Sequence, residues 1–354
     1  MPTDVKTYEE ALSWAHEVGG NQHALLGNGF SMAYNPALFG YAALAQRAED
    51  HSLLSDEVAG LMAAMGTPDF EATMRALDNA IRTLDALDAS GHSATISKLE
   101  AAVVEVREAL AQSVAGLHPD RPHEISEGRY RSVRRFLRPF KNIYTVNYDL
   151  LLYWALMQEV PDGEFTHPGR AHDDGFRDSR VDGDTTVLWD VYDPFKQSVY
   201  YLHGALHLYI GADGLRKLTW VRTDEALIEQ TREQLALHRF PLYVAESESL
   251  RKLDRINRSA YLGRGLRSLT SIGGSMVIFG HSLDQNDDHV LEAVVRSKTE
   301  RLAIALYGDP ASEDNKRIAA AAEDLRRRRT LADSGRALDI AYFDASSTNL
   351  WVEC

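Results

Sequence analysis

The sequence is poor in cysteine, in net positive charge and in long apolar runs, and each shortage excludes a class of protein. Cys354 is the only cysteine among 354 residues, which excludes an internal disulfide framework and every cysteine-based zinc site. The apolar run at 150–157 is far shorter than the ~20 residues that cross a membrane. Residues 1–18 carry acidic side chains and lack the apolar segment of a secretory signal, so we expect a cytoplasmic protein.

Acidic residues outnumber basic ones, with 52 Asp and Glu against 38 Lys and Arg, so the net charge is -14. A protein that binds nucleic acid or an anionic membrane over a broad surface needs the opposite balance. One local basic run is either a solvated helix face or a contact surface for phosphate or an acidic partner. Its members are Arg129, Arg131, Arg134, Arg135, Arg138 and Lys141.

Strand-like and helix-like segments alternate along the chain. Apolar and β-branched runs predict strands, and apolar spacing near 3.6 residues predicts helices. The expected strands fall at 22–31, 141–149, 198–211 (one bent strand or a hairpin), 217–221, 273–287, 301–308 and 338–344. The expected helices fall at 7–17, nearly throughout 36–140, and at 150–156, 224–237, 248–270, 288–299 and 314–329. We expect a long loop at 161–187.

This alternation predicts an α/β protein with a Rossmann-like, doubly wound and mainly parallel sheet. The helical stretch between the first two core strands is then an insertion that lies over the sheet edge. We therefore divide the chain into an N-terminal helix (1–19), a helical insertion (36–139) and a Rossmann-like domain (20–35 plus 140–354). In such sheets a ligand binds at the carboxyl ends of the strands.

Two polar turns follow the first two expected core strands. The first contains Gly27, Asn28, Gly29, Phe30 and Ser31. Its glycines allow close approach to a phosphate, or they form a plain turn between a strand and a helix. The second turn contains Thr145, Asn147 and Asp149. Asn147 can hold an amide or a hydroxyl, or Asn147 forms the turn and Asp149 caps the next helix.

Two further turns complete the set. His203 and Gly204 end an expected strand, where the imidazole either titrates near neutral pH or is a structural residue. His207 lies four residues later, so a metal pair is an alternative. Gly280, Ser282 and Asp284 follow the strand at 273–279 and suit a phosphate or ribose, or they form a loop with a helix cap.

In this order the four turns resemble those of the sirtuin family. In detail the chain resembles divergent bacterial sirtuin-like proteins more than the protein deacylases. It cannot build the four-cysteine zinc module of the deacylases, and residues 30–41 replace their usual segment after the glycine turn. The residues that carry the resemblance are Gly27, Gly29, Ser31, Thr145, Asn147, Asp149, His203, Gly204, Gly280 and Ser282.

The resemblance implies an NAD-binding domain at 20–35 plus 140–354, with NAD as substrate and no metal. Bacterial proteins of this type act as effectors of antiphage defence. They hydrolyse NAD to nicotinamide and ADP-ribose, and the infected cell stops growing. The expected catalytic residues are Asn147, His203 and Asp149. The expected cofactor-binding residues are Gly27, Asn28, Gly29, Phe30, Ser31, Thr145, Gly204, Gly280, Ser282 and Asp284.

Three other functions remain open at this point. The chain could be a non-catalytic sensor of NAD or ADP-ribose, an ADP-ribosyl transferase or deacylase, or a metal hydrolase built on His203 and His207. An unrestrained NAD hydrolase is toxic to its host, so we expect control by a homo-oligomer, a partner sensor subunit or a nucleotide signal. The helical insertion and the basic run at 129–141 are the expected contact surfaces.

Overall fold

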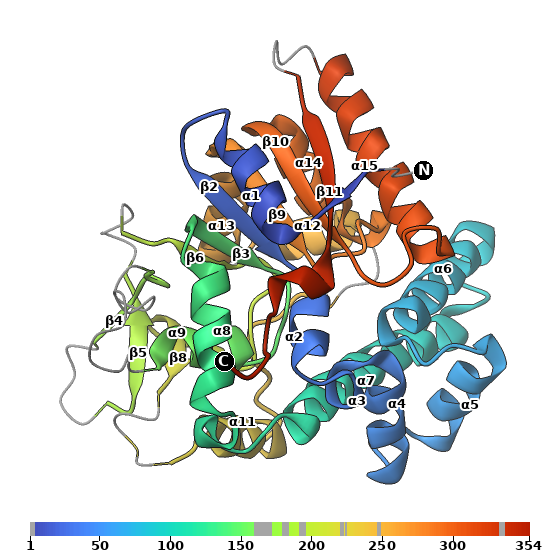
Figure 1. The fold of residues 1–354 in the computed structure, drawn as a ribbon. Coiled ribbons are helices and arrows are strands. Elements are labelled where there is room, and N and C mark those ends of the chain that lie inside the picture. The colour runs from blue at the N-terminus through green and yellow to red at the C-terminus, as the bar shows by residue number, and fades with distance from the viewer. Residues whose placement is uncertain are drawn as a thin grey trace.

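A parallel β-sheet forms the centre of the molecule (Figure 1). The computed structural model describes residues 4–158, 172–178, 184–190, 196–219, 223, 225–245, 249–332 and 337–354. Within these residues seven strands form this sheet, and each neighbouring pair is parallel. The strands are β1 (Val5–Lys6), β2 (Gln22–Leu26), β3 (Phe140–Thr145), β6 (Val199–Tyr201), β9 (Gly273–Phe279), β10 (Lys298–Leu306) and β11 (Asp339–Asp344).

The strand order is β1-β11-β10-β9-β2-β3-β6. The chain starts the core with β2, adds β3 and β6 on one side, and then adds β9, β10 and β11 on the other side. This is the Rossmann order 3-2-1-4-5-6, with β1 as a seventh strand beside β11. The order reverses between β2 and β9, whose last residues Leu26 and Phe279 are paired. The predicted Rossmann-like α/β fold is therefore confirmed.

Helices cover both faces of this sheet, because its buried strands carry apolar side chains on both sides. Ala24 and Leu26 of β2 pack into one cluster, and Leu25 packs into the other. The first cluster is completed by α1 (Tyr8–His16), α8 (Glu127–Leu137) and α9 (Leu151–Met157). The second is completed by α13 (Ala260–Ser271), α14 (Asp288–Arg296) and α15 (Glu313–Leu331).

The chain between β2 and β3 is almost entirely helical, as predicted. Its helices before α8 are α2 (Gly29–Tyr34), α3 (Pro36–Phe39), α4 (Tyr41–Asp50), α5 (Asp56–Met65), α6 (Phe70–Asp88), α7 (Ser93–Leu117) and η1 (Pro122–Glu124). Polar caps start several of them: the Asp69 carboxylate, for example, accepts from the backbone N–H groups of Glu71 and Ala72. Figure 1 shows α3 to α7 gathered at one end of the sheet.

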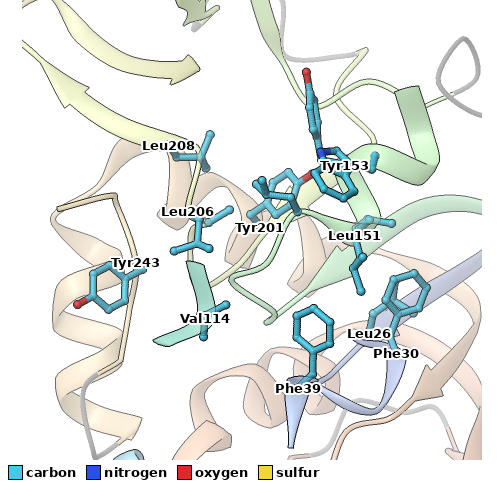
Figure 2. Packing of buried hydrophobic residues seen from close by; sticks show 14 of the residues in the cluster. Leu26, Phe30, Phe39, Val114, Leu151, Tyr153, Tyr201, Leu206, Leu208 and Tyr243 are labelled. Carbon is cyan, nitrogen blue, oxygen red and sulfur yellow. The ribbon is translucent and has the colours of Figure 1, made fainter. Parts of the chain in front are cut away.

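An apolar cluster joins this helical segment to the sheet. Phe39 of α3 is buried with Leu26 of β2 and with Phe30 of α2, and Figure 2 shows these three side chains close together. Val114 of α7 belongs to the same cluster, and α7 also packs against α11 (Leu227–Ala236). The helical segment is therefore anchored to the ends of the core strands through a continuous core.

A second, antiparallel sheet lies outside the parallel one. Its order is β4-β5-β8-β7, with β4 (Phe176–Asp178), β5 (Thr186–Trp189), β7 (Leu208–Gly211) and β8 (Gly214–Leu218). The prediction for 198–211 was wrong, because the chain leaves the parallel sheet after β6 and enters the second sheet at β7. The expected loop at 161–187 contains β4 and the start of β5, and its residues 161–171 and 179–183 lie outside the described chain.

The remaining helices also fall where the sequence predicted them. The expected helix at 248–270 is divided into α12 (Ser249–Asn257) and α13, and the helix at 224–237 is α11. Short η2 (Gln285–Asp287) leads into α14, and η3 (Ala345–Thr348) follows β11. Within the described residues, no helix has the length and apolar character that a membrane span requires.

Candidate functional site at the switch point of the sheet

Three glycines meet where the strand order reverses. The backbone N–H of Gly27 donates to Phe279 O, and that of Gly29 donates to Gly280 O, both at 2.9 Å. A Cβ added to Gly29 would lie 2.4 Å from Gly280 Cα, and Gly280 has a φ of +68°. Contact between the turns after β2 and β9 therefore requires these glycines, whether or not a phosphate binds there.

The other expected cofactor-binding residues of these two turns divide between core and surface. The Asn28 side-chain amide donates to Phe39 O at 3.0 Å. Phe30 is 1% exposed and packs edge-on against Trp351, so it belongs to the core. Ser282 is exposed, and Asp284 is an exposed cap that accepts from the Asn286 N–H. Ser282 and Asp284 are therefore open to a ligand, Asn28 is partly buried, and Phe30 is enclosed.

A short hydrogen-bond chain joins the turns after β2 and β3. The Ser31 hydroxyl contacts Asp149 Oδ2 at 2.5 Å, and the Asn147 amide contacts the same hydroxyl oxygen at 3.0 Å. The other oxygen of Asp149 accepts from the Leu151 N–H at 2.9 Å, at the start of α9. Thr145 is buried, and its Oγ1 accepts from the Asn147 N–H. The sequence therefore selected four residues that lie in one group.

The hydrogen bonds among Asp149, Ser31 and Asn147 fix the orientation of the Asn147 amide. An ionised Asp149 has no hydrogen to donate, so the Ser31 hydroxyl donates to Asp149 and can only accept from Asn147. Asn147 must then present its NH₂ group to Ser31, which leaves Oδ1 on the other side. That oxygen is buried, and no described residue forms a hydrogen bond with it. Burial raises the pKa of Asp149, although the hydrogen bonds from Ser31 and Leu151 oppose the shift.

His203 lies at the end of β6 in a second polar group. Its Nε2 lies 2.9 Å from His289 Nε2 and 3.7 Å from Asp287 Oδ1. Gly204 turns the chain here with a φ of +79°, and a Cβ at this position would lie 1.9 Å from Leu242 O. Burial lowers the pKa of His203 well below its usual range, although the Asp287 charge opposes this. The imidazole is therefore neutral at pH 7.

Charged side chains from two further helices complete this group. Lys252 of α12 contacts Asp287 Oδ1 at 2.8 Å and Glu71 Oε2 of α6 at 3.0 Å. Burial lowers the pKa of Lys252, but these two carboxylates raise it more. Asn286 and Tyr148 also donate to Glu71, at 2.7 and 3.1 Å. With both carboxylates ionised and the imidazoles neutral, the group carries one negative charge in excess.

Tyr148 connects the two polar groups. It follows Asn147 directly, and its ring lies parallel to the His203 ring with 6.5 Å between centroids. The single hydroxyl hydrogen of Tyr148 is shared between Glu71 Oε1, at 3.1 Å, and Val244 O, at 2.8 Å. Desolvation raises the pKa of Tyr41 of α4, and the charges of Glu71 and Asp287 add to this shift. Tyr148 therefore links the Asn147 turn to His203 and to Glu71 of the helical segment.

Two hollows of the surface lie away from these residues. One, of about 490 Å³, lies at the amino ends of β2 and β3, on the opposite edge of the sheet, and its lining includes Asn21, Arg138 and Lys141. A smaller one, of about 190 Å³, lies between α4, α7 and α11. Neither of these two hollows is lined by residues of the polar groups at the switch point.

Within the described residues, His203, Asp287 and His289 form a group that could hold a metal ion, since their ligand atoms all lie within 4.8 Å of one another. His207 does not belong to this group. It is fully buried beside the rings of Tyr153 and Tyr201. The metal pair of His203 and His207 that the sequence left open is therefore replaced by a different set of residues.

The sequence did not reveal several members of the site. Glu71 and Lys252 lie in helices with ordinary amphipathic patterns, so no local signal marks them. His289 follows a run of polar residues at 284–288. This run is the one sequence feature that marks His289 as a candidate site residue. Only the fold brings these helices to the end of β6.

These features define an α/β protein with a Rossmann-type sheet and a buried polar site at the switch point. The chain matches the family described as "Domain of unknown function (DUF4917)" over residues 24–351, and it belongs to that family. The matched region runs from β2 to the residues beyond β11 and includes every site residue described above. No curated protein matches the chain.

Proposed function

We propose that this protein is an NAD⁺ glycohydrolase that cleaves NAD⁺ to nicotinamide and ADP-ribose, and that it acts as an effector of bacterial antiphage defence. The observation that carries the proposal is the Asn147 amide at the switch point. Its Oδ1 is buried, has no hydrogen-bond partner in the described part of the chain and is held in place through Ser31. An acceptor of this kind suits the carboxamide of nicotinamide or a ribose hydroxyl. The sirtuin-like order of the four turns supports the same function.

The reaction asks little of an acid catalyst. Heterolysis of the bond between the ribose C1′ and the nicotinamide nitrogen sends the electron pair to the pyridinium ring, so nicotinamide leaves as a neutral molecule. Water then adds to C1′ and loses a proton. His203 is the proposed base, because its lowered pKa keeps a lone pair available at neutral pH. Asn147 orients the nicotinamide end of the substrate.

The charge of the second polar group also supports this reaction. The ribose develops positive charge as the bond to nicotinamide breaks. Glu71 and Asp287 carry two negative charges against one positive charge on Lys252, which contacts both carboxylates, and Asp287 lies 3.7 Å from His203. The net negative charge of this group stabilises the positive charge that develops on the ribose in the transition state.

The adenosine half is proposed to lie along the turn after β9. Ser282 and Asp284 are exposed there and offer a hydroxyl and a carboxylate to ribose. The diphosphate is proposed to lie by the turn at Gly27, Asn28 and Gly29. A cytoplasmic location and restraint by a homo-oligomer or a partner subunit remain part of the proposal.

The test is nicotinamide release from NAD⁺ by the purified protein, with and without lysate from phage-infected cells as a source of trigger. We expect Asn147→Ala and His203→Ala each to lower the rate at least ~100-fold. His238→Asn is the matched control, because His238 is exposed and has a left-handed backbone (φ 53°) that asparagine adopts readily. If the wild type binds NAD⁺ in calorimetry but releases no nicotinamide under either condition, the protein is a sensor and the proposed activity is wrong.

A further inference from the structure

We infer that His203, Asp287 and His289 form a binding site for a divalent transition-metal ion, and that a metal ion bound there inhibits the cleavage of NAD⁺. The ligands come from three separate places in the chain: His203 lies two residues after β6, Asp287 ends η2, and His289 lies in the first turn of α14. No single stretch of sequence carries the site. The inhibition rests on the proposed function, whereas the binding does not.

The distances suit a small metal ion. The two Nε2 atoms of His203 and His289 lie 2.9 Å apart, and His203 Nε2 lies 3.7 Å from Asp287 Oδ1. Zn–N and Zn–O bonds of about 2.0–2.2 Å place neighbouring ligands of a tetrahedral ion roughly 3.3–3.6 Å apart. Changes of a few tenths of an ångström bring these two distances into that range, and the ligand atoms of Asp287 and His289, which lie within 4.8 Å of each other, need to approach by at most about 1.5 Å.

Outer hydrogen bonds orient two of the ligands. His289 Nδ1 lies 3.2 Å from the Ser249 hydroxyl, which leaves Nε2 as the ligand atom. The Leu283 N–H donates to His281 Nδ1 at 2.9 Å, so a neutral His281 carries its hydrogen on Nε2. That nitrogen lies 3.3 Å from Asp287 Oδ2 but makes no hydrogen bond within the described part of the chain. The Asp287 carboxylate is held instead by Lys252, whose Nζ donates to Oδ1 at 2.8 Å.

The charges allow a divalent ion to enter. Lys252 bonds to Glu71 as well as to Asp287, so its ammonium group keeps a partner when the Asp287 oxygen binds a metal. The negative excess of the group favours a cation. The side chains of Asp287 and Glu71 are 13% and 20% exposed, which gives an ion access from the surface. Two imidazoles and one carboxylate select a transition metal such as Zn²⁺ over Mg²⁺, which prefers oxygen ligands.

The same lone pair serves both roles of His203. A neutral imidazole has one free lone pair, and a metal ion that uses it leaves none to accept a proton from water. The ion also brings positive charge beside a ribose that is itself becoming positive. Metal binding and NAD⁺ cleavage are therefore mutually exclusive at this site.

The first test is direct binding of metal ions to the purified protein, without NAD⁺. We expect calorimetry to detect one Zn²⁺ per chain, Co²⁺ to give the visible absorption of a low-coordinate site, and Mg²⁺ to give no signal at the same concentration. His289→Ala and Asp287→Asn should each weaken Zn²⁺ binding by at least roughly 100-fold. Removing a ligand lowers the metal affinity more than removing a residue that only hydrogen-bonds to a ligand. Ser249→Ala should weaken it by about 10–100-fold. His238→Asn is the control and should bind like the wild type.

The second test adds Zn²⁺ to the nicotinamide assay. We expect inhibition of the wild type at the concentrations that saturate the site in calorimetry, and we expect Ser249→Ala to need correspondingly more Zn²⁺. Absence of Zn²⁺ binding by the wild type overturns the site, and so does unchanged binding by both Asp287→Asn and Ser249→Ala. Zn²⁺ binding without inhibition overturns only the regulatory part. A protein that binds Zn²⁺ but never cleaves NAD⁺ contradicts the proposed function and leaves the metal site standing.

Discussion

At the scale of the residue, Asn147 takes its orientation from a carboxylate that it does not touch. Asp149 fixes the hydrogen of the Ser31 hydroxyl, and that hydroxyl fixes which end of the Asn147 amide faces it. The unpaired Oδ1 is the result of this chain. An unpaired buried oxygen destabilises the fold, so its retention is understandable if a ligand supplies the missing donor. Ser31 and Asp149 are therefore positioning residues.

Asp149→Asn is expected to reverse the Asn147 amide without moving the backbone. If the new amide keeps its oxygen toward the Leu151 N–H, it presents its NH₂ group to Ser31. The hydroxyl then donates to Asn147, which turns Nδ2 into the position that Oδ1 held. Nicotinamide release should fall by about 100-fold, as when one stabilising hydrogen bond is lost from an active site.

Stability should change in the opposite direction to activity. The Asp149 carboxylate is buried and its pKa is raised, so replacing it by a neutral amide should leave the unfolding temperature unchanged or raise it. A purely structural role predicts lower stability together with a normal rate. Parallel measurement of kcat and of thermal unfolding separates these two cases.

Some residues of the site could be predicted from the sequence, and others could not. Asn147, Asp149 and Ser31 stand in turns after strands, where a local pattern indicates function, and the structure places them in one group. Glu71 and Lys252 could not be found in this way, because their roles depend on which helices the fold brings to the sheet edge. From the sequence, the glycines of the first turn are expected to let a phosphate approach. Their contact with the turn after β9 could not be predicted, because it depends on the tertiary structure.

At the scale of the element, the turns after β2 and β9 behave as one interlocked unit. Gly27, Gly29 and Gly280 bring two backbones together without side chains between them. The polar groups of the site are attached to these turns: Ser31 follows one, and His281 follows the other. Helices α6 and α12 are joined to each other by the pairs Glu71–Lys252 and Asp78–Arg251. The site is therefore formed by chain segments that lie far apart in the sequence.

Gly29→Ala should destabilise the protein markedly. The added methyl group would lie 2.4 Å from Gly280 Cα, and backbone cannot yield as a flexible side chain does. Overpacking of this kind typically costs about 1–3 kcal/mol in the free energy of unfolding. Urea denaturation at constant pH measures the change.

Gly60→Ala provides the matched control. Gly60 lies within α5 and is exposed, and no other group lies within 4 Å of the position that an alanine methyl would take there. The same substitution at this position should stabilise the protein by about 0.5–1 kcal/mol, because alanine favours a helix. If both variants have the same stability, the contact between the turns does not constrain the fold.

At the scale of the whole molecule, buried neutral histidines make stability depend on pH. Burial lowers the pKa of His23, His118 and His289 to about 4 each, against 6.5 for an ordinary imidazole. The unfolded chain therefore binds more protons than the native chain between pH 6.5 and 4. Asp149 acts in the opposite direction, because its pKa is raised. Because three histidines act in one direction and Asp149 in the other, the net effect is a loss of stability as the pH falls.

The free energy of unfolding should accordingly fall as the pH drops below 6.5, and the fall should continue below pH 4, because the Lys252 charge holds the pKa of Asp287 well below its usual range despite burial. Each of the three histidines contributes roughly 1.4 kcal/mol per pH unit between pH 6.5 and about 4. Urea denaturation at pH 7, 6 and 5 tests this directly. His118→Gln should flatten the slope, and equal stability of the wild type at pH 7 and pH 5 would contradict the expectation.

The α/β fold as a whole could be predicted, because its strands are continuous apolar runs and its helices have clear periodicity. The small antiparallel sheet could not. Its strand β4 covers three residues, and the transfer of the chain from β6 to β7 depends on contacts of Gly204 with the distant residue Leu242. β1 was also missed, since two residues carry no periodicity and form a strand only beside β11.

The wide separation of the site residues along the chain also sets when the site can form. Glu71 meets Lys252 across 181 positions and Asn286 across 215 positions. Contacts of such long range form late in folding, because the loops that they close are entropically costly. During synthesis the segment that contains Glu71 leaves the ribosome before α12 and α14, so Glu71 cannot contact Lys252 or Asn286 until those residues have been added. A growing chain therefore has no assembled site, and any activity that depends on it begins only after His289 has been added.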